Sequence, residues 1–273
     1  MFTSVELAAR IEAAECALVS ACARSVGARR PDEGVFVEPF AGGAAVFAGV
    51  DSPMTKIVGI GFAEGGIDRE ALGRLEAEFA DRGATPIIEL STLADPAIAT
   101  TLTRRGYVLR GFENVLGRRL DGVIDFPATD GTVAPSPDAE LEAWVDVMVD
   151  GFGTPDPAGI ESHESFPREA LQRVMSDSSP EHERFAARRD GVLAAGASLR
   201  MGEGVALLCG SATLPAHRRH GLQAALLSAR LRAAAEAGCE LAVVTTQPGS
   251  TSQANVQRRG FELLYARAVL SQD

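Results

Sequence analysis

The sequence repeats itself at a near-constant spacing, and this repeat constrains the fold more than any other feature. Gly83 and Gly238 each stand shortly before a short apolar run typical of a buried strand. The segment Arg104–Tyr107 (Arg-Arg-Gly-Tyr) returns as Arg258–Phe261 (Arg-Arg-Gly-Phe) at nearly the same separation along the chain. Helix, strand, helix and strand patterns occur in the same order in both halves. A repeat of this length predicts two copies of one domain.

Length and composition agree with two globular domains of ordinary size. The chain has 273 residues, 46% of them hydrophobic, which is enough to bury two cores. We find no uncharged apolar stretch as long as a membrane-spanning helix requires, so no membrane partner is expected. The net charge of −11 argues against a nucleic-acid-binding surface and favours a cationic or neutral substrate.

The cysteines and the N-terminal residues predict a cytoplasmic protein. Cys16, Cys22, Cys209 and Cys239 have neither the spacing of metal ligands nor that of a disulfide framework, so we expect reduced thiols and no metal site. The N-terminal residues lack the basic and apolar regions of a signal peptide.

The spacing of apolar residues and of Gly and Pro predicts the secondary structure by residue range. The predicted domains are 1–125 and 131–273. Residues 121–137, rich in Gly, Pro, Asp and Thr, are interpreted as the linker, with a short strand at 132–134. We expect helices at 5–25, 68–82, 95–105, 138–152, 166–175, 221–237 and 252–259, and strands at 35–37, 44–48, 57–62, 86–90, 107–116, 185–188, 192–199, 205–213, 241–245 and 261–270.

A basic turn precedes the predicted helix 221–237. The segment His217–His220 holds two arginines and two histidines, although a helix N-terminus carries partial positive charge and favours acidic residues. A multiply charged anion bound by the backbone amides of the turn would remove this conflict. Gly221 would let the backbone come close to another group at the helix start. The alternative is a solvated basic turn on a surface loop.

The first half differs at the matching position. The repeat aligns the basic turn with Glu64–Asp68, which holds no arginine. Asp68 supplies a carboxylate at the N-cap of its own helix, as a helix without a bound anion prefers. The sequence therefore predicts that only the second half keeps an anion site.

The second half resembles the GNAT acetyltransferase family. Arg218–Gln223 on a strand-to-helix turn is similar to the family motif Q/R-x-x-G-x-G/A, with Gln223 where a small residue is usual. Ser252–Asn255 and Arg258–Phe261 resemble the second conserved segment of the family. The resemblance covers residues 131–271, and residues 1–120 resemble a degenerate copy. It implies an α/β fold of two GNAT-like domains, each with a central mixed, mostly antiparallel sheet flanked by helices.

The same resemblance implies that acetyl-CoA is the acyl donor and that CoA is the product. The turn amides would bind the pyrophosphate, the arginine side chains would reach a CoA phosphate, and pantetheine would lie along the strand that leads into the turn. Ser252 and Asn255 would contact the CoA arm. The implied cofactor-binding residues are Ala212, Thr213, Leu214, Arg218, Arg219, His220, Gly221, Leu222, Gln223, Ala224, Ser252 and Asn255.

By the same resemblance, an amine attacks the acetyl carbonyl directly, and a backbone N–H near Ala212 to Leu214 holds the developing oxyanion. Val256 stands where many members carry the tyrosine that protonates the thiolate. Tyr265 and Ser252 are the remaining candidates for the acid, and a packing role for Tyr265 and an N-cap role for Ser252 are the alternatives. Asn255 has the alternative of a helix-surface amide. The candidates for a general base are Glu164 and its neighbours Glu161 and His163, with solvated loop residues as the alternative.

Three functions remain open from the sequence. The leading hypothesis is an N-acetyltransferase acting on a primary amine of a small molecule. The second is a non-catalytic acyl-CoA-binding or regulatory protein, and the third is a different nucleotide-binding α/β protein, against which the turn lacks the Lys-Ser/Thr of a P-loop. The repeat also predicts a monomer whose halves pack as a pseudo-dimer, with a homodimer as the alternative.

Overall fold

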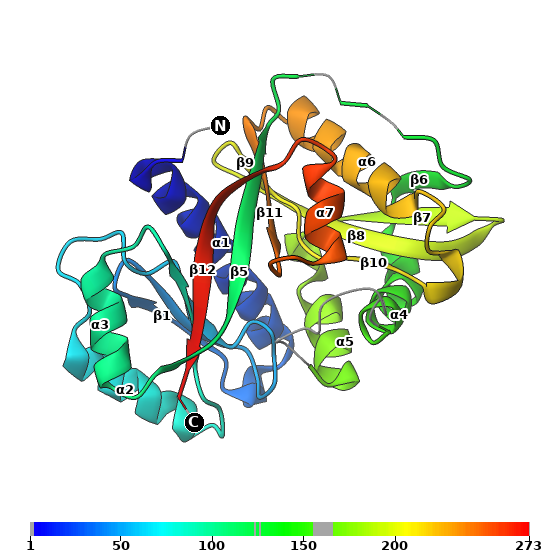
Figure 1. Ribbon diagram of the computed structural model, residues 1–273. Helices are drawn as coiled ribbons and strands as arrows, with labels where there is room; N and C mark the ends of the chain where they lie inside the picture. The colour runs from blue at the N-terminus through cyan, green and yellow to red at the C-terminus, as the bar shows by residue number, and fades with distance from the viewer. Residues whose placement is uncertain (1–2, 123, 126, 155–165, 273) are drawn as a thin grey trace.

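A computed structural model describes residues 3–122, 124–125, 127–154 and 166–272 (Figure 1). In both halves, helices and strands follow one another in nearly the order that the sequence predicts. The first half contains α1 (Val5–Arg29), β1 (Phe36–Phe40), β2 (Gly43–Phe47), β3 (Lys56–Val58), α2 (Arg69–Ala80), β4 (Ile87–Ser91), α3 (Pro96–Arg104) and β5 (Val108–Arg119). The second half contains β6 (Thr132–Pro135), α4 (Leu141–Phe152), α5 (Arg168–Asp177), β7 (Glu183–Arg189), β8 (Val192–Gly202), β9 (Val205–Leu207), β10 (Ser211–Thr213), α6 (Leu222–Glu236), β11 (Leu241–Thr246), α7 (Thr251–Gln257) and β12 (Glu262–Ser271).

Side chains at the helix starts explain why the N-terminal boundaries of the first half were predictable. Ser4 accepts a hydrogen bond from the Leu7 amide at 3.1 Å, and Asp95 accepts one from the Ala97 amide at 2.9 Å. Such caps satisfy backbone donors that have no partner within the helix. They are local signals, so they can be read from the sequence alone.

The strands form one sheet that runs through both halves. Its order is β1-β2-β3-β4-β12-β5-β11-β9-β8-β7-β6, with β10 pairing with β8 off this path. The last strand of each half lies in the sheet of the other half, because β5 pairs antiparallel with β11 and β12 pairs antiparallel with β4. Strands β5 and β12 also pair with each other at the centre of the molecule (Figure 1). The fold class was predictable from the sequence, whereas this exchange of strands was not.

Helix α1 packs against both halves behind the central strands (Figure 1). Its residues Ala8 and Ile11 belong to the same buried cluster as Val205 of the second half. Val19 of the same helix packs with Val46 of the first half. Helices α2 and α3 contribute to a separate core of the first half, and α6 contributes to the core of the second. Helix α1 therefore joins the two halves through apolar contacts.

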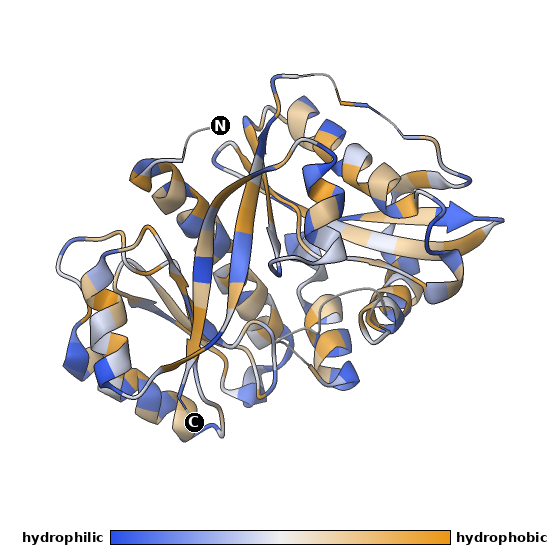
Figure 2. Ribbon diagram, in the orientation of Figure 1, coloured by the Kyte–Doolittle hydropathy of each residue, from blue (hydrophilic) through white to orange (hydrophobic). Residues whose placement is uncertain are grey.

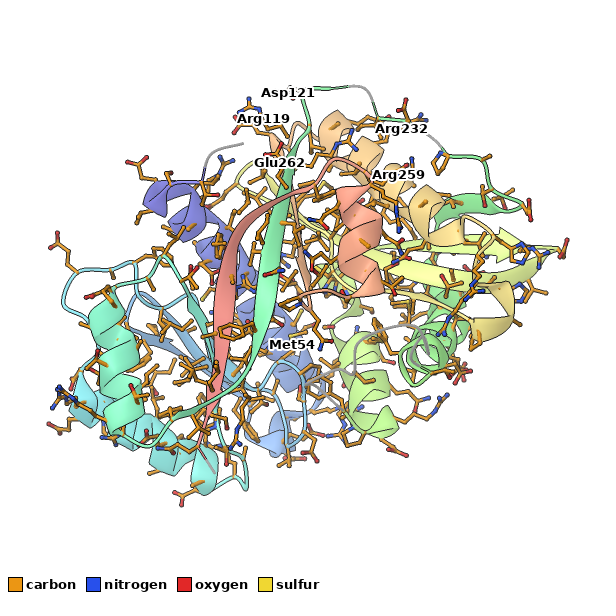
Figure 3. All side chains as sticks on the ribbon, in the orientation of Figure 1. Met54, Arg119, Asp121, Arg232, Arg259 and Glu262 are labelled. Carbon is orange, nitrogen blue, oxygen red and sulfur yellow. The ribbon has the colours of Figure 1, made fainter. Side chains whose placement is uncertain are left out.

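The linker begins at the C-terminal end of β5, where Arg119 and Asp121 lie close together (Figure 3). Arg119 Nε donates to Asp121 Oδ2 at 2.7 Å.

The strands of the second half carry mostly apolar residues (Figure 2), as expected for a sheet covered by helices. Within the described ranges, no helix is both long enough and apolar enough to cross a membrane.

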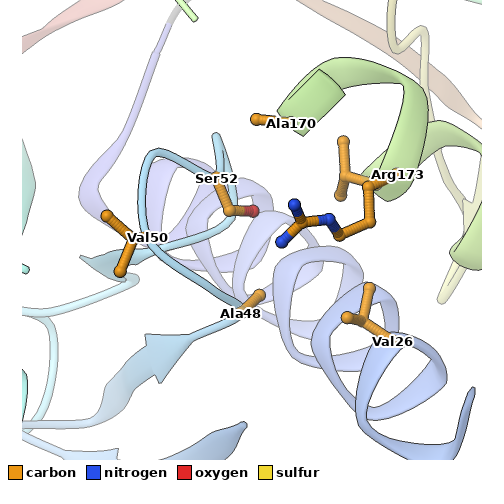
Figure 4. Close-up of a pocket in the computed structure, with 7 residues that line it drawn as sticks. Val26, Ala48, Val50, Ser52, Ala170 and Arg173 are labelled. Carbon is orange, nitrogen blue, oxygen red and sulfur yellow. The ribbon is translucent and has the colours of Figure 1, made fainter. Parts of the chain in front are cut away.

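The halves also meet at a crevice between α1, the loop after β2, and α5. Figure 4 shows the side chain of Arg173 in this crevice, next to Ser52 and Val26. Arg173 also lies 3.5 Å from a carboxylate oxygen of Glu33. An ion pair across this contact indicates that the crevice is part of the packing between the halves.

Candidate active site in the second half

Strands β9 and β11 separate in the second half. Their parallel pairing ends at Leu208, whose amide donates to the Val243 carbonyl at 2.9 Å. The next two carbonyls, of Cys209 and Gly210, both accept from the Ser198 amide of β8, each at 3.1 Å. β9 pairs with both β8 and β11, and at this bulge the chain leaves β11, so that β10 continues along β8 alone. The predicted strand 205–213 is therefore two strands with an opening between β10 and the end of β11.

The bulge directs two successive amides into this opening. In a trans peptide the N–H points opposite to the carbonyl of the preceding residue. Because the Cys209 and Gly210 carbonyls face β8, the Gly210 and Ser211 N–H groups point away from β8, toward the opening. Thr213 also presents its N–H there, since Leu214 on one side of it donates to the Ala194 carbonyl at 2.9 Å. The Leu214 N–H, one of the expected oxyanion donors, is thus bonded to β8, whereas the Gly210 and Ser211 N–H groups, which the sequence analysis did not single out, face the opening.

Two buried hydroxyls lie on the strands that border the opening. Ser211 Oγ at the start of β10 and Thr246 Oγ1 at the end of β11 have no hydrogen-bond partner among the described residues. The same holds for His217 Nδ1 in the turn that follows β10. Buried polar atoms are usually satisfied, and each one that is not costs about 1–3 kcal/mol. Their position favours a polar ligand between β10 and β11.

The turn after β10 gives α6 an N-terminus to which no side chain of the described residues forms a capping hydrogen bond. Arg219 and Gly221 both have positive φ angles, +66° and +75°, and α6 begins at Leu222 with no acidic residue in its first turn. At the start of α2, by contrast, Asp68 Oδ1 accepts from the amides of Glu70 and Ala71 at 2.9 and 3.3 Å. The α6 amides remain available to an anion, whereas Asp68 occupies the equivalent position in the first half.

The basic side chains of the turn differ in what they contact. Arg218 donates to the carbonyls of Thr213 and Gly151, both at 3.2 Å, and also to the carbonyl of Thr154. It therefore holds the end of α4 against β10, and these bonds to backbone carbonyls direct its guanidinium to the chain itself and not to the phosphate expected from the sequence. Arg219 is exposed, and no described residue forms a hydrogen bond or ion pair with it. Arg219 is the better candidate for a phosphate contact.

The linker packs over the turn. A Cβ atom at Gly221 would lie 2.7 Å from the Ala128 carbonyl oxygen, so glycine is required for contact with the linker. Thr129 Oγ1 donates to the His220 carbonyl at 3.0 Å, and His220 Nδ1 lies 3.0 Å from Asp130 Oδ2. The close approach that Gly221 allows is therefore to the chain itself.

Comparison with known proteins shows which family the segment around this site resembles. Residues 146–261 match the model of the acetyltransferase (GNAT) family. This segment belongs to the GNAT acetyltransferase family. Members of this family typically take the acetyl group from acetyl-CoA. No curated protein sequence matches the chain significantly.

Solved structures extend the likeness in fold to the first half. A GCN5-related N-acetyltransferase from Kribbella flavida has a TM-score of 0.64 and 22% identity, over 92% of this chain and 95% of its own. A tandem GNAT protein from the clavulanic acid biosynthesis pathway has a TM-score of 0.58 and 16% identity, over 85% of this chain and 80% of its own. A third, from Sphaerobacter thermophilus, has a TM-score of 0.59 and 14% identity, over 79% and 70%. The chain as a whole thus has the tandem GNAT fold.

Helices α6 and α7 of the GNAT half contact each other next to the turn. Asn255 Nδ2 donates to Gln223 Oε1 at 2.7 Å, so Gln223 binds α7 in place of the small residue of the motif. Asn255 Oδ1 in turn accepts from Arg258 at 2.8 Å. Ser252 is exposed on α7, and the N-cap of this helix is Ser250, which accepts from the Gln253 amide at 3.1 Å. The N-cap alternative for Ser252 is therefore wrong.

Of the candidate acids and bases, Tyr265 and Ser252 are among the described residues. Tyr265 of β12 is buried and donates its phenolic proton to Glu12 Oε1 at 2.7 Å, and burial raises its pKa above the ordinary value. This placement favours the packing alternative over the predicted role as an acid. Val256, at the position of the family tyrosine, is a buried residue of α7. Glu164, Glu161 and His163 lie outside the described residues.

Proposed function

We propose that the C-terminal half transfers the acetyl group of acetyl-CoA to a primary amine of a small molecule. The observation that carries this proposal is the difference between the two helix starts: α6 lacks a capping side chain among the described residues, whereas Asp68 caps α2. The unpartnered hydroxyls of Ser211 and Thr246 beside the opening fit the polar pantetheine arm. We propose the Leu222, Gln223 and Ala224 amides, with exposed Arg219, as ligands of the pyrophosphate.

The chemistry follows from where the backbone donors point. The Gly210 and Ser211 N–H groups would bind the carbonyl oxygen of the thioester and hold the negative charge that develops as the amine attacks. The C–N bond forms and the C–S bond breaks, and the amine loses a proton as the CoA thiolate gains one. The chain contributes mainly by positioning the reactants and by stabilising the oxyanion. Solvent can serve as the acid and the base for the two proton transfers. Ser252 and Asn255 remain proposed contacts to the CoA arm.

We propose further that residues 1–125 and 131–273 are two copies of one domain, of which only the second binds acetyl-CoA. The exchange of β5 and β12 supports one polypeptide whose halves pack as a pseudo-dimer. The net charge of −11 supports an acceptor that is cationic or neutral.

The test is the release of CoA thiol from acetyl-CoA in the presence of a panel of primary amines. We expect CoA thiol to be released only when an acceptor amine is present. We also expect the mass of that amine to increase by one acetyl group. The absence of release with every amine, despite binding of acetyl-CoA, would instead support the second candidate function.

That second candidate is a non-catalytic acyl-CoA-binding protein. It is favoured by Val256 at the position of the family tyrosine and by the hydrogen bond that occupies Tyr265. It predicts thermal stabilisation by CoA without turnover.

A further inference from the structure

Arg230 of α6 is a buried cation whose hydrogen bonds all go to backbone carbonyls. Its side chain is fully enclosed, with the residue 4% exposed. The guanidinium donates to the carbonyls of Leu226, Ser198 and Cys209 at 3.3, 3.0 and 3.4 Å. Desolvation lowers its pKa to about 10. No carboxylate of the described residues forms a hydrogen bond or an ion pair with it.

Among the described residues, the other two buried arginines have such a partner. Arg267 donates to Glu12 at 2.7 Å, and Arg184 donates to Asp138 at 2.6 Å. A buried charge without a counter-ion costs several kcal/mol, and an apolar residue of similar volume is often the more stable choice. Arg230 therefore has a cost that core packing alone does not explain.

The carbonyls that Arg230 binds are those of the bulge. Ser198 is the β8 residue opposite the bulge, and its amide binds the Cys209 and Gly210 carbonyls. Arg230 binds the Ser198 and Cys209 carbonyls from the α6 side, so its guanidinium fixes the point at which the chain leaves β11 while it remains paired with β8. The Cys209 carbonyl belongs to the same peptide unit as the Gly210 N–H. A cation at this carbonyl draws electron density from the N–H and makes it a stronger donor.

We infer that Arg230 is a positioning residue for acetyl transfer, which holds the bulge and strengthens the Gly210 N–H that receives the thioester oxygen. This inference rests on the proposed function. It explains why the uncompensated charge is retained: negative charge develops on the far side of the same peptide unit during the reaction. The side chain acts through the peptide and does not touch the substrate.

The experiment measures the carbonyl resonance of acetyl-CoA labelled with ¹³C at the thioester carbon, bound to the full chain. Hydrogen bonds from Gly210 and Ser211 should move this resonance downfield of its position in water. Arg230→Met should lose at least half of this displacement, and should lower kcat at least about tenfold with little change in the KM for acetyl-CoA. Arg184→Met is the matched control, because the guanidinium of this buried arginine of the same half donates to the Ser179 carbonyl and to Asp138 and not to the carbonyls of the bulge. It should lose stability and keep the wild-type displacement.

Arg230→Lys provides a second variant in case the methionine variant does not fold. Lysine keeps the charge, and a buried ammonium loses its proton more readily than a guanidinium does. The displacement in Arg230→Lys should therefore recover as pH falls; Cys209 is the titratable neighbour that influences this site. A wild-type displacement in Arg230→Met would overturn the inference and leave acetyl-CoA binding intact. Where that variant does not fold, a displacement in Arg230→Lys that equals the wild-type value at every pH would overturn it. Failure of the wild type to bind acetyl-CoA would overturn the proposed function and the inference together.

Discussion

Arg267 Nε donates to Glu12 Oε1 at 2.7 Å, and the two side chains are 1% and 2% exposed. This contact joins β12, the last strand of the chain, to α1, its first helix. At Arg267, β12 also pairs with both β4 and β5. Glu89 and Glu113 also lie 3.6 Å from the same guanidinium. The charge of Arg267 is therefore shared by carboxylates of α1, β4 and β5, and Tyr265 adds a hydrogen bond to Glu12.

Removal of this charge should destabilise the whole chain. Arg267→Met would leave buried carboxylates without their counter-ion, at a cost of about 3–5 kcal/mol in the free energy of unfolding. Urea unfolding checks this value. Arg74→Met breaks an exposed ion pair with Glu70 and should change stability by less than about 0.5 kcal/mol. Equal effects of the two substitutions would contradict the structural role of Arg267.

Substitution of Tyr265 separates packing from acid catalysis. Tyr265→Phe removes the hydroxyl that binds Glu12, so a loss of about 1–3 kcal/mol in stability is expected. The kcat for acetyl transfer should stay within a few-fold of wild type, because the hydroxyl is buried and already bonded. A hundredfold drop in kcat at a temperature where the variant is folded would restore Tyr265 as the acid.

Glu15 predicts a dependence of stability on pH. Burial raises the pKa of its carboxyl group, so the folded chain holds this proton more tightly than the unfolded chain does. The stability that this group contributes is present at acidic pH and is lost as pH rises through the raised pKa. Glu15→Gln should therefore be more stable than wild type at neutral pH, with the gain shrinking on acidification. Thermal unfolding across pH checks this, and a gain that grew on acidification would contradict it.

The two glycine turns provide a matched pair of substitutions. Gly221→Ala places a Cβ 2.7 Å from the Ala128 carbonyl in a residue with positive φ, so the turn must shift and CoA affinity should fall. Gly65→Ala in the first half also has positive φ, but its Cβ would meet no described atom within 4 Å. It should leave CoA affinity unchanged. Isothermal titration of both variants with CoA measures the two affinities. Equal affinities would show that the turn at Gly221 is not part of the binding site.

The exposed arginine of the turn should contribute electrostatic affinity. Arg219→Glu should weaken CoA binding by about tenfold or more, since it replaces a phosphate-attracting charge with a repelling one. The effect should shrink at high salt. Arg69→Glu, at the start of α2, is the control and should have no effect on binding. A loss of affinity from Arg69→Glu instead would place the anion in the first half.

Local signals explain which parts of the fold could be predicted from the sequence. Ser4, Asp68 and Asp95 cap their helices as single residues, so those boundaries can be read directly. The exchange of β5 and β12 depends on pairing between strands far apart in the sequence, for which no local pattern exists. The order of elements therefore was predictable, whereas the partner of each final strand was not.

The same distinction applies to the site. The missing cap of α6 could be predicted because it depends on residues of the turn itself. The contacts of Arg218 with the end of α4, and of Gly221 with the linker, are non-local and gave both residues roles that the motif does not indicate. A glycine such as Gly210 directly after an apolar strand is a signal that could have indicated the bulge.

The most direct measurement is a crystal structure of the full chain at saturating acetyl-CoA. We predict that the pyrophosphate lies at the N-terminus of α6, with the acetyl carbonyl facing the Gly210 and Ser211 amides between β10 and β11. Cofactor density against the N-terminus of α2, or a turn at residues 218–224 without cofactor density at saturation, would contradict it.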